Sequence, residues 1–223
     1  MAIVLGVIAD DFTGATDVAS VLAAQGMRVV QVNGLPEPGA AAVEGDAVVV
    51  ALKTRTVPAD EAVAQSLQAL AWLQGLGAEQ FMFKYCSTFD STPAGNIGPV
   101  MDALSEALDA PIAIVCPAFP DNGRRIYRGH LFVGDQLLED SPMKDHPLTP
   151  MRQSSLVRLL AEQSQRKVGM IPLETVRQGA DALRAELDRL QRDGVAYSVA
   201  DATDNDDLRR WAEAVADHHL ITG

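Results

Sequence analysis

The sequence predicts an α/β fold: a three-layer α/β/α domain with a mostly parallel sheet and a small β-hairpin insertion. Two observations lead to this prediction. Short, continuous apolar runs recur along the chain, as expected for strands buried on both faces of a parallel sheet. Amphipathic stretches long enough for helices separate most of these runs, and that alternation implies right-handed crossovers with helices on both faces of the sheet.

The first half of the chain shows the alternation clearly. Gly26 is placed to end the first helix, and Pro58 starts the second, which has an acidic first turn. We expect strands at 3–9, 28–32, 46–52, 80–86 and 111–118, and helices at 13–26, 58–75 and 96–108.

The alternation then breaks and resumes. Residues 122–133 are expected to form two short strands with Gly129 near the bend, and the proline-rich stretch 137–151 an irregular loop. Ser154 or Ser155 is placed to cap the next helix. Further helices are expected at 156–163, 180–194 and 204–218, and strands at 167–171, 196–200 and 219–223. A chain that ends on a strand, where a functional loop would begin, is expected to be part of a longer protein.

Composition excludes several classes of partner. The net charge is −12 and no basic block occurs, which argues against nucleic acid or an anionic membrane surface as a partner but allows a small anionic ligand. Cys86 and Cys116 lack CxxC spacing and are expected to be reduced thiols. No apolar run is long enough to span a bilayer, and the N-terminus reads as a strand rather than a signal peptide. We therefore expect a cytoplasmic protein.

The first candidate site follows the first strand, in the stretch "IADDFTGATD". Asp10 or Asp11 could take a proton from a substrate hydroxyl, or hold a metal or sugar hydroxyls. Because successive side chains of a strand point in opposite directions, only one of the two aspartates is expected to point into the site. The alternative is that Asp11 or Thr13 caps the helix. Gly14 stands alone, so the stretch is neither a dinucleotide fingerprint nor a Walker loop.

The second candidate site is "KYCSTFDSTPAGNIGPV", which connects a strand to a helix. Lys84 lies at the strand end, where an ammonium could meet a carboxylate or phosphate. Ser87, Asp90, Ser91 and Asn96 add the donors and acceptors that a sugar-like ligand requires. Each hydroxyl taken singly is equally typical of a turn that satisfies its own backbone. The lysine and the whole run together favour a binding site.

Two further stretches carry weaker signals. Arg124, Arg125 and Arg128 on the predicted hairpin could clamp an anion, or could simply be solvated charges on an edge strand. His146 could act as an acid, a base or a ligand, although a lone histidine is more often structural. No set of His, Asp and Glu has metal-ligand spacing, so no metal site is predicted.

Four motifs together resemble one family. They are "GVIADDFTGATDVAS", "FKYCSTFDSTPAGNIGPV", "CPAFPDNGRRIYRGHLFV" and "DHPLTPM", and in this order they resemble the N-terminal part of the four-carbon acid sugar kinases, also known as DUF1537. The combination of "KYCSTFDST" with "GNIGPV" is most similar to the members that act on 3-oxo-tetronate. The resemblance runs across the whole chain.

The resemblance implies an ATP-dependent kinase that phosphorylates the terminal (4-)hydroxyl of a four-carbon sugar acid. Residues 1–223 would be the acid-sugar-binding domain, and a C-terminal nucleotide-binding domain outside this chain would hold most of the ATP and Mg²⁺. Asp10 and Asp11 would be the catalytic residues. The residues expected to bind the substrate are Thr13, Asp17, Lys84, Ser87, Asp90, Ser91, Asn96 and Arg125.

The narrower substrate depends on a departure from the family pattern. Relatives that act on threonate or erythronate tend to have an arginine before the Gly-Asn pair, where this chain has Pro93 and Ala94. The departure favours the 3-oxo acid and leaves Arg125 and Lys84 as candidates to hold the substrate carboxylate. A kinase for threonate or erythronate and a non-catalytic acid-sugar-binding module remain the alternatives. A nicotinamide-dependent oxidoreductase is disfavoured because the glycine fingerprint is missing. A homodimer is possible.

Overall fold

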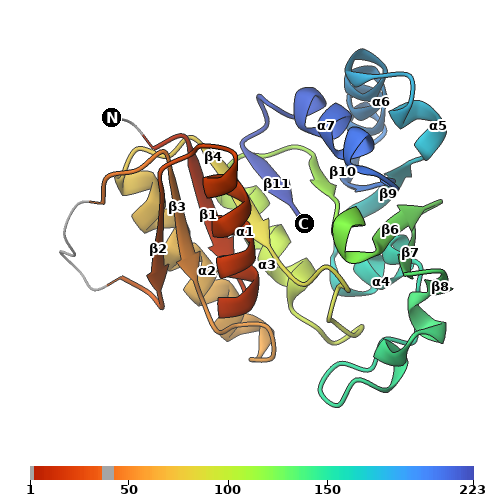
Figure 1. The fold of residues 1–223 in the computed structure, drawn as a ribbon, viewed down its shortest axis with the longest axis horizontal. Coiled ribbons are helices and arrows are strands. Elements are labelled where there is room, and N and C mark those ends of the chain that lie inside the picture. Colours follow the sequence, from red (N-terminus) through yellow and green to blue (C-terminus); the bar gives the residue numbers. More distant parts are fainter. Residues whose placement is uncertain (1–2, 37–42) are drawn as a thin grey trace.

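An eight-stranded parallel sheet forms the centre of the molecule (Figure 1). The computed structural model describes residues 3–36 and 43–223. All strand pairs of the large sheet run parallel. The predicted α/β class with a mostly parallel sheet is confirmed. In order across the sheet, the strands are β2 (Val29–Asn33), β3 (Ala47–Ala51), β1 (Leu5–Ala9), β4 (Gln80–Lys84), β11 (Leu220–Thr222), β5 (Ala113–Val115), β10 (Val195–Ala200) and β9 (Lys167–Ile171).

Three helices cover one face of this sheet: α2 (Ala59–Gly75), α3 (Ile97–Ala107) and α4 (Leu156–Gln163). Their apolar sides form the largest core cluster with strand residues such as Ile8 and Phe83, which are 1 % exposed each. The neighbouring strand residue Val7 belongs to a different cluster on the opposite face, as the alternation of a strand requires. This alternation explains why the strands read as continuous apolar runs.

The opposite face has two separate coverings. Helix α1 (Phe12–Ala24) packs on β1, β2 and β3, while α5 (Leu173–Val176), α6 (Ala180–Arg192) and α7 (Asn205–Ala214) pack over β5, β9 and β10. Figure 1 shows β11 between these two groups, with the end of the chain at its tip. On this face Met82 of β4 and Ile221 of β11 are only partly buried. The middle of the sheet is therefore the least covered part of this face.

The chain reverses its direction across the sheet between β1 and β4. From β1 it passes through α1 to β2 on one side, whereas from β4 it passes through α3 to β5 on the other. Helices reached by right-handed crossovers in opposite directions lie on opposite faces, and sheets with such a reversal usually bind ligands in a crevice beyond the carboxyl ends of the strands concerned. The loops that follow β1 and β4 therefore meet where ligands usually bind in such sheets.

The predicted hairpin insertion is a small antiparallel sheet with one strand more than expected. It contains β6 (Arg124–Tyr127), β7 (His130–Val133) and the two-residue strand β8 (Gln136–Leu137). Arg128 and Gly129 form its first turn with φ of 52° and 70°, the two left-handed residues of a type I′ hairpin. The loop expected at 137–151 contains two short 3-10 helices, Leu138–Asp140 and Pro142–Asp145, and a third, Pro120–Asn122, precedes β6.

A buried aspartate fastens this small sheet to the large one. Asp201 follows β10 and is fully buried; its carboxylate accepts the backbone N–H groups of Arg128 at 2.7 Å, Gly129 at 2.9 Å and Leu173 at 3.1 Å. Backbone bonds between Ile126 and Ala202 continue the connection. The insertion is thus held over the carboxyl end of β10 by main-chain bonds.

Both cysteines are free thiols, as the spacing predicted. Burial raises the pKa of Cys116 to about 12, which keeps this thiol protonated and unreactive at neutral pH. Within the described ranges, no helix is both long enough and apolar enough to cross a membrane.

Candidate functional site

The ends of β1, β3 and β4 are joined by backbone hydrogen bonds. The N–H of Asp10 donates to the carbonyl of Lys84 at 3.0 Å, and the carbonyl of Asp10 accepts from Thr54 at 2.9 Å and Arg55 at 3.2 Å. Three loops that are distant in sequence therefore meet at the crevice between β1 and β4. The side chains that follow these strand ends form the candidate site.

Arg55 lies at the centre of this site, although the sequence did not single it out. Its Nε and Nη2 atoms donate to the two carboxylate oxygens of Asp10, at 3.0 and 2.7 Å. Nη2 also lies 2.8 Å from Oδ1 of Asp11, and Nη1 lies 4.0 Å from Oδ2 of Asp90. One guanidinium thus faces three carboxylates. We expected only one of the two adjacent aspartates to point into the site, and this was wrong: the strand ends at Ala9, and Asp11 turns back toward Arg55 as the chain enters α1.

Burial controls the charges of this cluster. The Asp10 side chain is 4 % exposed, and burial raises its pKa, against the opposing effect of the hydrogen bond with Arg55. Burial is also the largest single effect on Arg55 and opposes its charge, but the hydrogen bond with Asp10 and the charges of Asp10, Cys86 and Asp11 together outweigh it and raise the pKa of the guanidinium. Burial lowers the pKa of Lys84, whose ammonium donates to the carbonyl of Tyr85. The site holds two cations against three carboxylates in a poorly solvated place.

Asp11 caps α1 and still has a free oxygen. Its Oδ1 accepts the backbone N–H of Gly14 at 2.8 Å, so the predicted alternative of helix capping is correct for this residue. Oδ2 accepts no hydrogen bond from the described residues, and the side chain is 25 % exposed. A Cβ atom on Gly14 would lie 2.7 Å from Asp11 Oδ1, 3.6 Å from Lys84 Nζ and 3.8 Å from Arg55 Nη2. Asp11 is therefore the carboxylate that a ligand can reach.

The loop after β4 is held by its own polar side chains. Asn96 donates to the carbonyls of Thr54 at 2.7 Å and Val57 at 3.0 Å, which ties this loop to the one that carries Arg55. Asp90 is buried and accepts from the hydroxyl of Thr88 at 2.5 Å. Many of the polar groups in this run thus satisfy one another, as in the turn interpretation of the sequence.

Ser91 and Gln163 form a second fastening of the same loop. Gln163, at the end of α4, donates to the hydroxyl of Ser91 at 2.8 Å and to the carbonyl of Thr92 at 2.6 Å, and its Oε1 accepts from the N–H of Gly98 at 2.8 Å. Ser91 is 4 % exposed, and its side chain faces this amide. Nothing in the sequence pattern marked Gln163, because a glutamine at the end of an amphipathic helix is usually solvated.

Three predicted residues have free side chains near the start of α1 and the loop after β4. Thr13 and Asp17 are exposed, one helical turn apart on α1, and Ser87 is partly buried. None of the three side chains makes a hydrogen bond with the described residues. They can therefore contact a ligand without breaking an internal bond.

The structure places Arg125 away from this cluster. It lies on β6 and donates to the carbonyl of Thr203, beyond the end of β10. β10 is four strands from β1, which corresponds to about 19 Å at about 4.8 Å per strand. Of its neighbours, Arg128 pairs with Glu174 at 2.6 Å on the protein surface. Arg125 thus lies near the end of β10, four strands away from Asp10, rather than beside it.

His146 belongs to a turn. Its Nδ1 accepts the backbone N–H of Thr149 at 3.1 Å and lies 2.9 Å from the hydroxyl of the same residue. The structural interpretation of this lone histidine accounts for both contacts.

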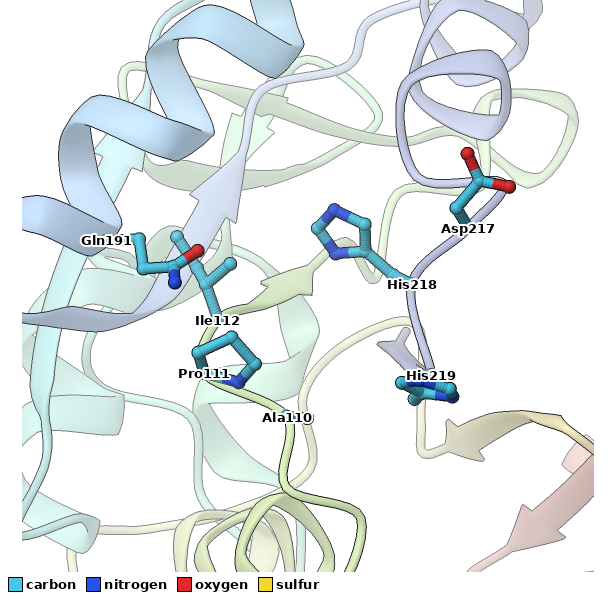
Figure 2. Close-up of a pocket in the computed structure, with 7 residues that line it drawn as sticks. All are labelled: Ala110, Pro111, Ile112, Gln191, Asp217, His218 and His219. Atoms are coloured by element: carbon cyan, nitrogen blue, oxygen red, sulfur yellow. The ribbon is translucent and has the colours of Figure 1, made fainter.

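A small cavity lies near the amino ends of β5 and β11, at the opposite end of the strands from Arg55. It has a volume of about 170 Å³ and is lined by Ala110–Ile112, Gln191 and Asp217–His219, where the chain enters β5 and β11. Figure 2 shows the His218 ring pointing into this cavity while the carboxylate of Asp217 points away from it. Burial lowers the pKa of His218, so its ring is neutral at physiological pH. Its place at the amino ends of the strands separates this cavity from the site at Arg55.

The site at Arg55 does not fit a resident Mg²⁺ ion in this arrangement. Mg²⁺ needs carboxylate or other oxygen ligands around an open centre. Here the guanidinium of Arg55 occupies the space between the three carboxylates. In the described part of the chain, no group of three or more His, Cys, Asp and Glu side chains is arranged to hold a metal ion.

Comparisons with known proteins agree with the fold and the motifs. Residues 5–223 match the family described as "Sugar-binding N-terminal domain". The 3-oxo-tetronate kinase of Cupriavidus necator is 59 % identical over 221 residues, which are 98 % of this chain and 51 % of that protein. The 3-oxo-tetronate kinase of Methylobacterium radiotolerans is 52 % identical over 223 residues, which are 100 % of this chain and 53 % of that protein. The chain spans about half the length of the curated relatives it matches.

Solved structures show the same architecture. Haemophilus influenzae protein HI1011, of the family DUF1537, aligns with a TM-score of 0.95 at 50 % identity, over 98 % of this chain and 53 % of that chain. A DUF1537 protein from Bordetella bronchiseptica, with bound citrate and as a domain-swapped dimer, aligns with a TM-score of 0.76 at 27 % identity, over 98 % of this chain and 52 % of that chain. The resemblance drawn from the four motifs is confirmed.

Proposed function

The chain belongs to the family of sugar-binding N-terminal domains, and from that premise we propose that residues 1–223 bind the substrate of a sugar-acid kinase. The substrate is a four-carbon acid, 3-oxo-tetronate, and the reaction transfers a phosphoryl group from ATP to its 4-hydroxyl. The observation that carries this proposal is the cluster of Asp10, Asp11, Arg55 and Lys84 at the crevice between β1 and β4, in a chain 59 % identical to a 3-oxo-tetronate kinase.

The two aspartates take different parts in this proposal. Both oxygens of Asp10 are engaged by Arg55, so Asp10 orients the guanidinium and does not accept the substrate proton. Asp11 keeps Oδ2 free, on a partly exposed side chain. This oxygen would take the proton of the 4-hydroxyl as the hydroxyl oxygen forms its bond to the γ-phosphorus and the bond from that phosphorus to the departing ADP breaks. Phosphoryl transfer needs positioning more than proton removal, so a weak base is sufficient.

The remaining predicted residues surround the polyhydroxy acid. Lys84 supplies a second positive charge that interacts with Asp11, and we assign the substrate carboxylate or the 3-oxo group to its free N–H donors. Thr13, Asp17 and Ser87 have free side chains for hydroxyl groups. Asp90, Ser91 and Asn96 act indirectly, by holding the loops of the site in place, because internal hydrogen bonds already engage their side chains. Arg125 stays a candidate for a group on the far side of the crevice.

ATP and Mg²⁺ are placed mainly on a second, nucleotide-binding domain. The relatives are about twice as long as this chain, and the described residues contain no glycine-rich phosphate loop at the crevice. That a Bordetella relative holds citrate supports binding of a small polycarboxylic or hydroxy acid by this kind of protein. The domain-swapped dimer of the same relative makes a homodimer worth testing. We place the reaction in the cytoplasm, as the sequence predicts.

The test uses the protein encoded by the whole reading frame that contains residues 1–223. We expect it to phosphorylate 3-oxo-tetronate with ATP and Mg²⁺, and we expect Asp11→Asn to lower kcat by about a hundredfold or more, because general bases contribute about 10²–10⁴ in rate. Asp135→Asn, at an exposed aspartate in the turn between β7 and β8, is the matched control. Wild-type turnover by Asp11→Asn would exclude Asp11 as the base.

A panel of four-carbon acids separates the alternatives. Turnover of threonate or erythronate in preference to the 3-oxo acid would replace the proposed substrate. Binding of an acid without any phosphoryl transfer by the full-length protein would favour a non-catalytic module. Both outcomes would leave the site at Arg55 in place and change its role.

A further inference from the structure

We propose that Arg55 is a positioning residue of the kinase reaction, which acts through Asp11, and that Asn96 acts through Arg55. This inference rests on the proposed function. Arg55 belongs to none of the four motifs and was not among the predicted site residues. Its place after β3, next to β1 in the sheet, brings it to the same crevice as Asp11.

Arg55 is held in place by Asp10 and in turn holds the carboxylate of Asp11. The edge of the guanidinium formed by Nε and Nη2 is fixed on Asp10 by two hydrogen bonds of 3.0 and 2.7 Å. The same Nη2 lies 2.8 Å from Asp11 Oδ1, so the fixed edge also determines where the Asp11 carboxylate stands. With Oδ1 held by Arg55 and by the N–H of Gly14, Oδ2 is the oxygen left to meet a substrate hydroxyl.

The loop that carries Arg55 is itself fastened at both ends. The N–H groups of Thr54 and Arg55 donate to the carbonyl of Asp10. The amide of Asn96 donates to the carbonyls of Thr54 and Val57, on the two sides of Arg55. A guanidinium held this firmly is oriented before the substrate arrives, which is what an electrostatic contribution to catalysis requires.

Arg55 also determines the charge around Asp11. The titratable groups that surround Asp11 and Arg55 are Asp10 directly after β1, Lys84 from β4, and Cys86 and Asp90 from the loop after β4. Without Arg55, three carboxylates would share the single ammonium of Lys84, which burial already disfavours. Like charges at such short distances raise each other's affinity for a proton. Loss of Arg55 should therefore make the carboxylates of this cluster harder to ionise.

The experiment compares Arg55→Met and Arg55→Lys in the full-length protein. For Arg55→Met we expect the acid limb of the kcat/KM profile to move up by about one to two pH units, the size of the effect of a neighbouring arginine on an aspartate. For Arg55→Lys we expect the limb to stay near its wild-type position. Its kcat should fall by about tenfold or more, because an ammonium cannot bridge two carboxylates as a planar fork does. Arg209→Met, at an exposed ion pair on α7, is the control and should match the wild type.

Asn96→Ala separates positioning from direct binding. If Asn96 acts through Arg55, kcat falls by about tenfold while the KM for the acid stays within about twofold, since misplacement of a catalytic group costs rate. A rise in KM at unchanged kcat would show that Asn96 binds the substrate itself and would overturn this part of the proposal.

Two results would overturn the role of Arg55. The first is an Arg55→Met protein with an unmoved acid limb. The second, which decides the question if Arg55→Met does not fold, is an Arg55→Lys protein with wild-type kcat. A titration of the Asp11 carboxyl carbon by NMR, in wild type and Arg55→Met or Arg55→Lys, measures the same coupling without turnover. If the wild type phosphorylates no four-carbon acid, the proposed function fails, while this titration still shows whether Arg55 determines the charge of Asp11.

Discussion

Replacement of Asp201 by asparagine should destabilise the fold through the small antiparallel sheet. In the wild type, Oδ2 of Asp201 accepts from Arg128 and Leu173, and Oδ1 accepts from Gly129. A carboxamide can keep its oxygen at the position that serves two donors, but its NH₂ group then faces the N–H of Gly129. One buried N–H loses its acceptor and the two remaining bonds lose their charge assistance, at about 1–3 kcal/mol for the unpaired group and about 1 kcal/mol for the weakened bonds together. We expect a loss of about 2–4 kcal/mol in the free energy of unfolding.

The assay is urea unfolding of the 223-residue chain, followed by circular dichroism, for wild type and Asp201→Asn. A lower midpoint at an unchanged m value would show a loss of stability in the same two-state transition. Asp135→Asn makes the same chemical change at an exposed position of the small sheet and should shift the free energy of unfolding by no more than about 0.5 kcal/mol.

A loss below about 1 kcal/mol for Asp201→Asn would refute the reasoning, because it would mean that the three backbone donors find other acceptors. An equal loss in the free energy of unfolding for both variants would refute it as well, since the burial of Asp201 and its hydrogen bonds would then make no difference to stability.

Two further stability predictions follow from packing and from charge. A Cβ atom at Gly98 would lie 2.6 Å from Cβ of Gln163, so Gly98→Ala should cost about 1–3 kcal/mol in thermal or urea unfolding; Gly75→Ala, with nothing within 4 Å in the last turn of α2, is the control and should be neutral or slightly stabilising. For Lys84, burial holds the pKa in the folded state below its unfolded value of about 10.4. The unfolded chain then binds more protons, and wild-type stability rises with pH between the folded and unfolded pKa values. Lys84→Met lacks this rise, so it should be at least as stable as the wild type at pH 7, with a difference that narrows toward pH 10; a clear loss of stability at pH 7 would contradict this.

The fold could be predicted well because it depends on patterns that are local in sequence. Strands buried on both faces read as apolar runs, and the helices between them carry an apolar side and recognisable ends. The prediction missed features that depend on distant partners or on very short elements. The strand β8 has two residues and α5 has four, too few for any periodicity to show. The buried role of Asp201 depends on N–H groups more than 70 residues away in the chain.

The candidate site was predicted less completely for the same reason. The rule that ligands bind at the carboxyl ends of strands selected the loops after β1 and β4, which meet in the structure. The same rule applied to the strand at 46–52 would have drawn attention to Arg55, the only arginine in the loop that follows it. The strand order, in which β3 is next to β1, could not be read from the sequence. Without it, the hydrogen bonds from Asn96 to the loop that carries Arg55 could not be predicted.

The charge of the cluster indicates what residues 1–223 would contribute to the proposed reaction. Asp10, Asp11 and Asp90 carry three negative charges when ionised, against two positive charges on Arg55 and Lys84. Arg55 is engaged by carboxylates, and the ammonium of Lys84 already donates to a carbonyl. A transferred phosphoryl group spreads negative charge over its oxygens and needs cations that are free to meet it. A cluster with one net negative charge can orient hydroxyl groups and accept a proton, but it is poorly suited to hold phosphates. This supports a division of labour in which residues 1–223 hold the acid and the groups that neutralise the phosphates come from outside them.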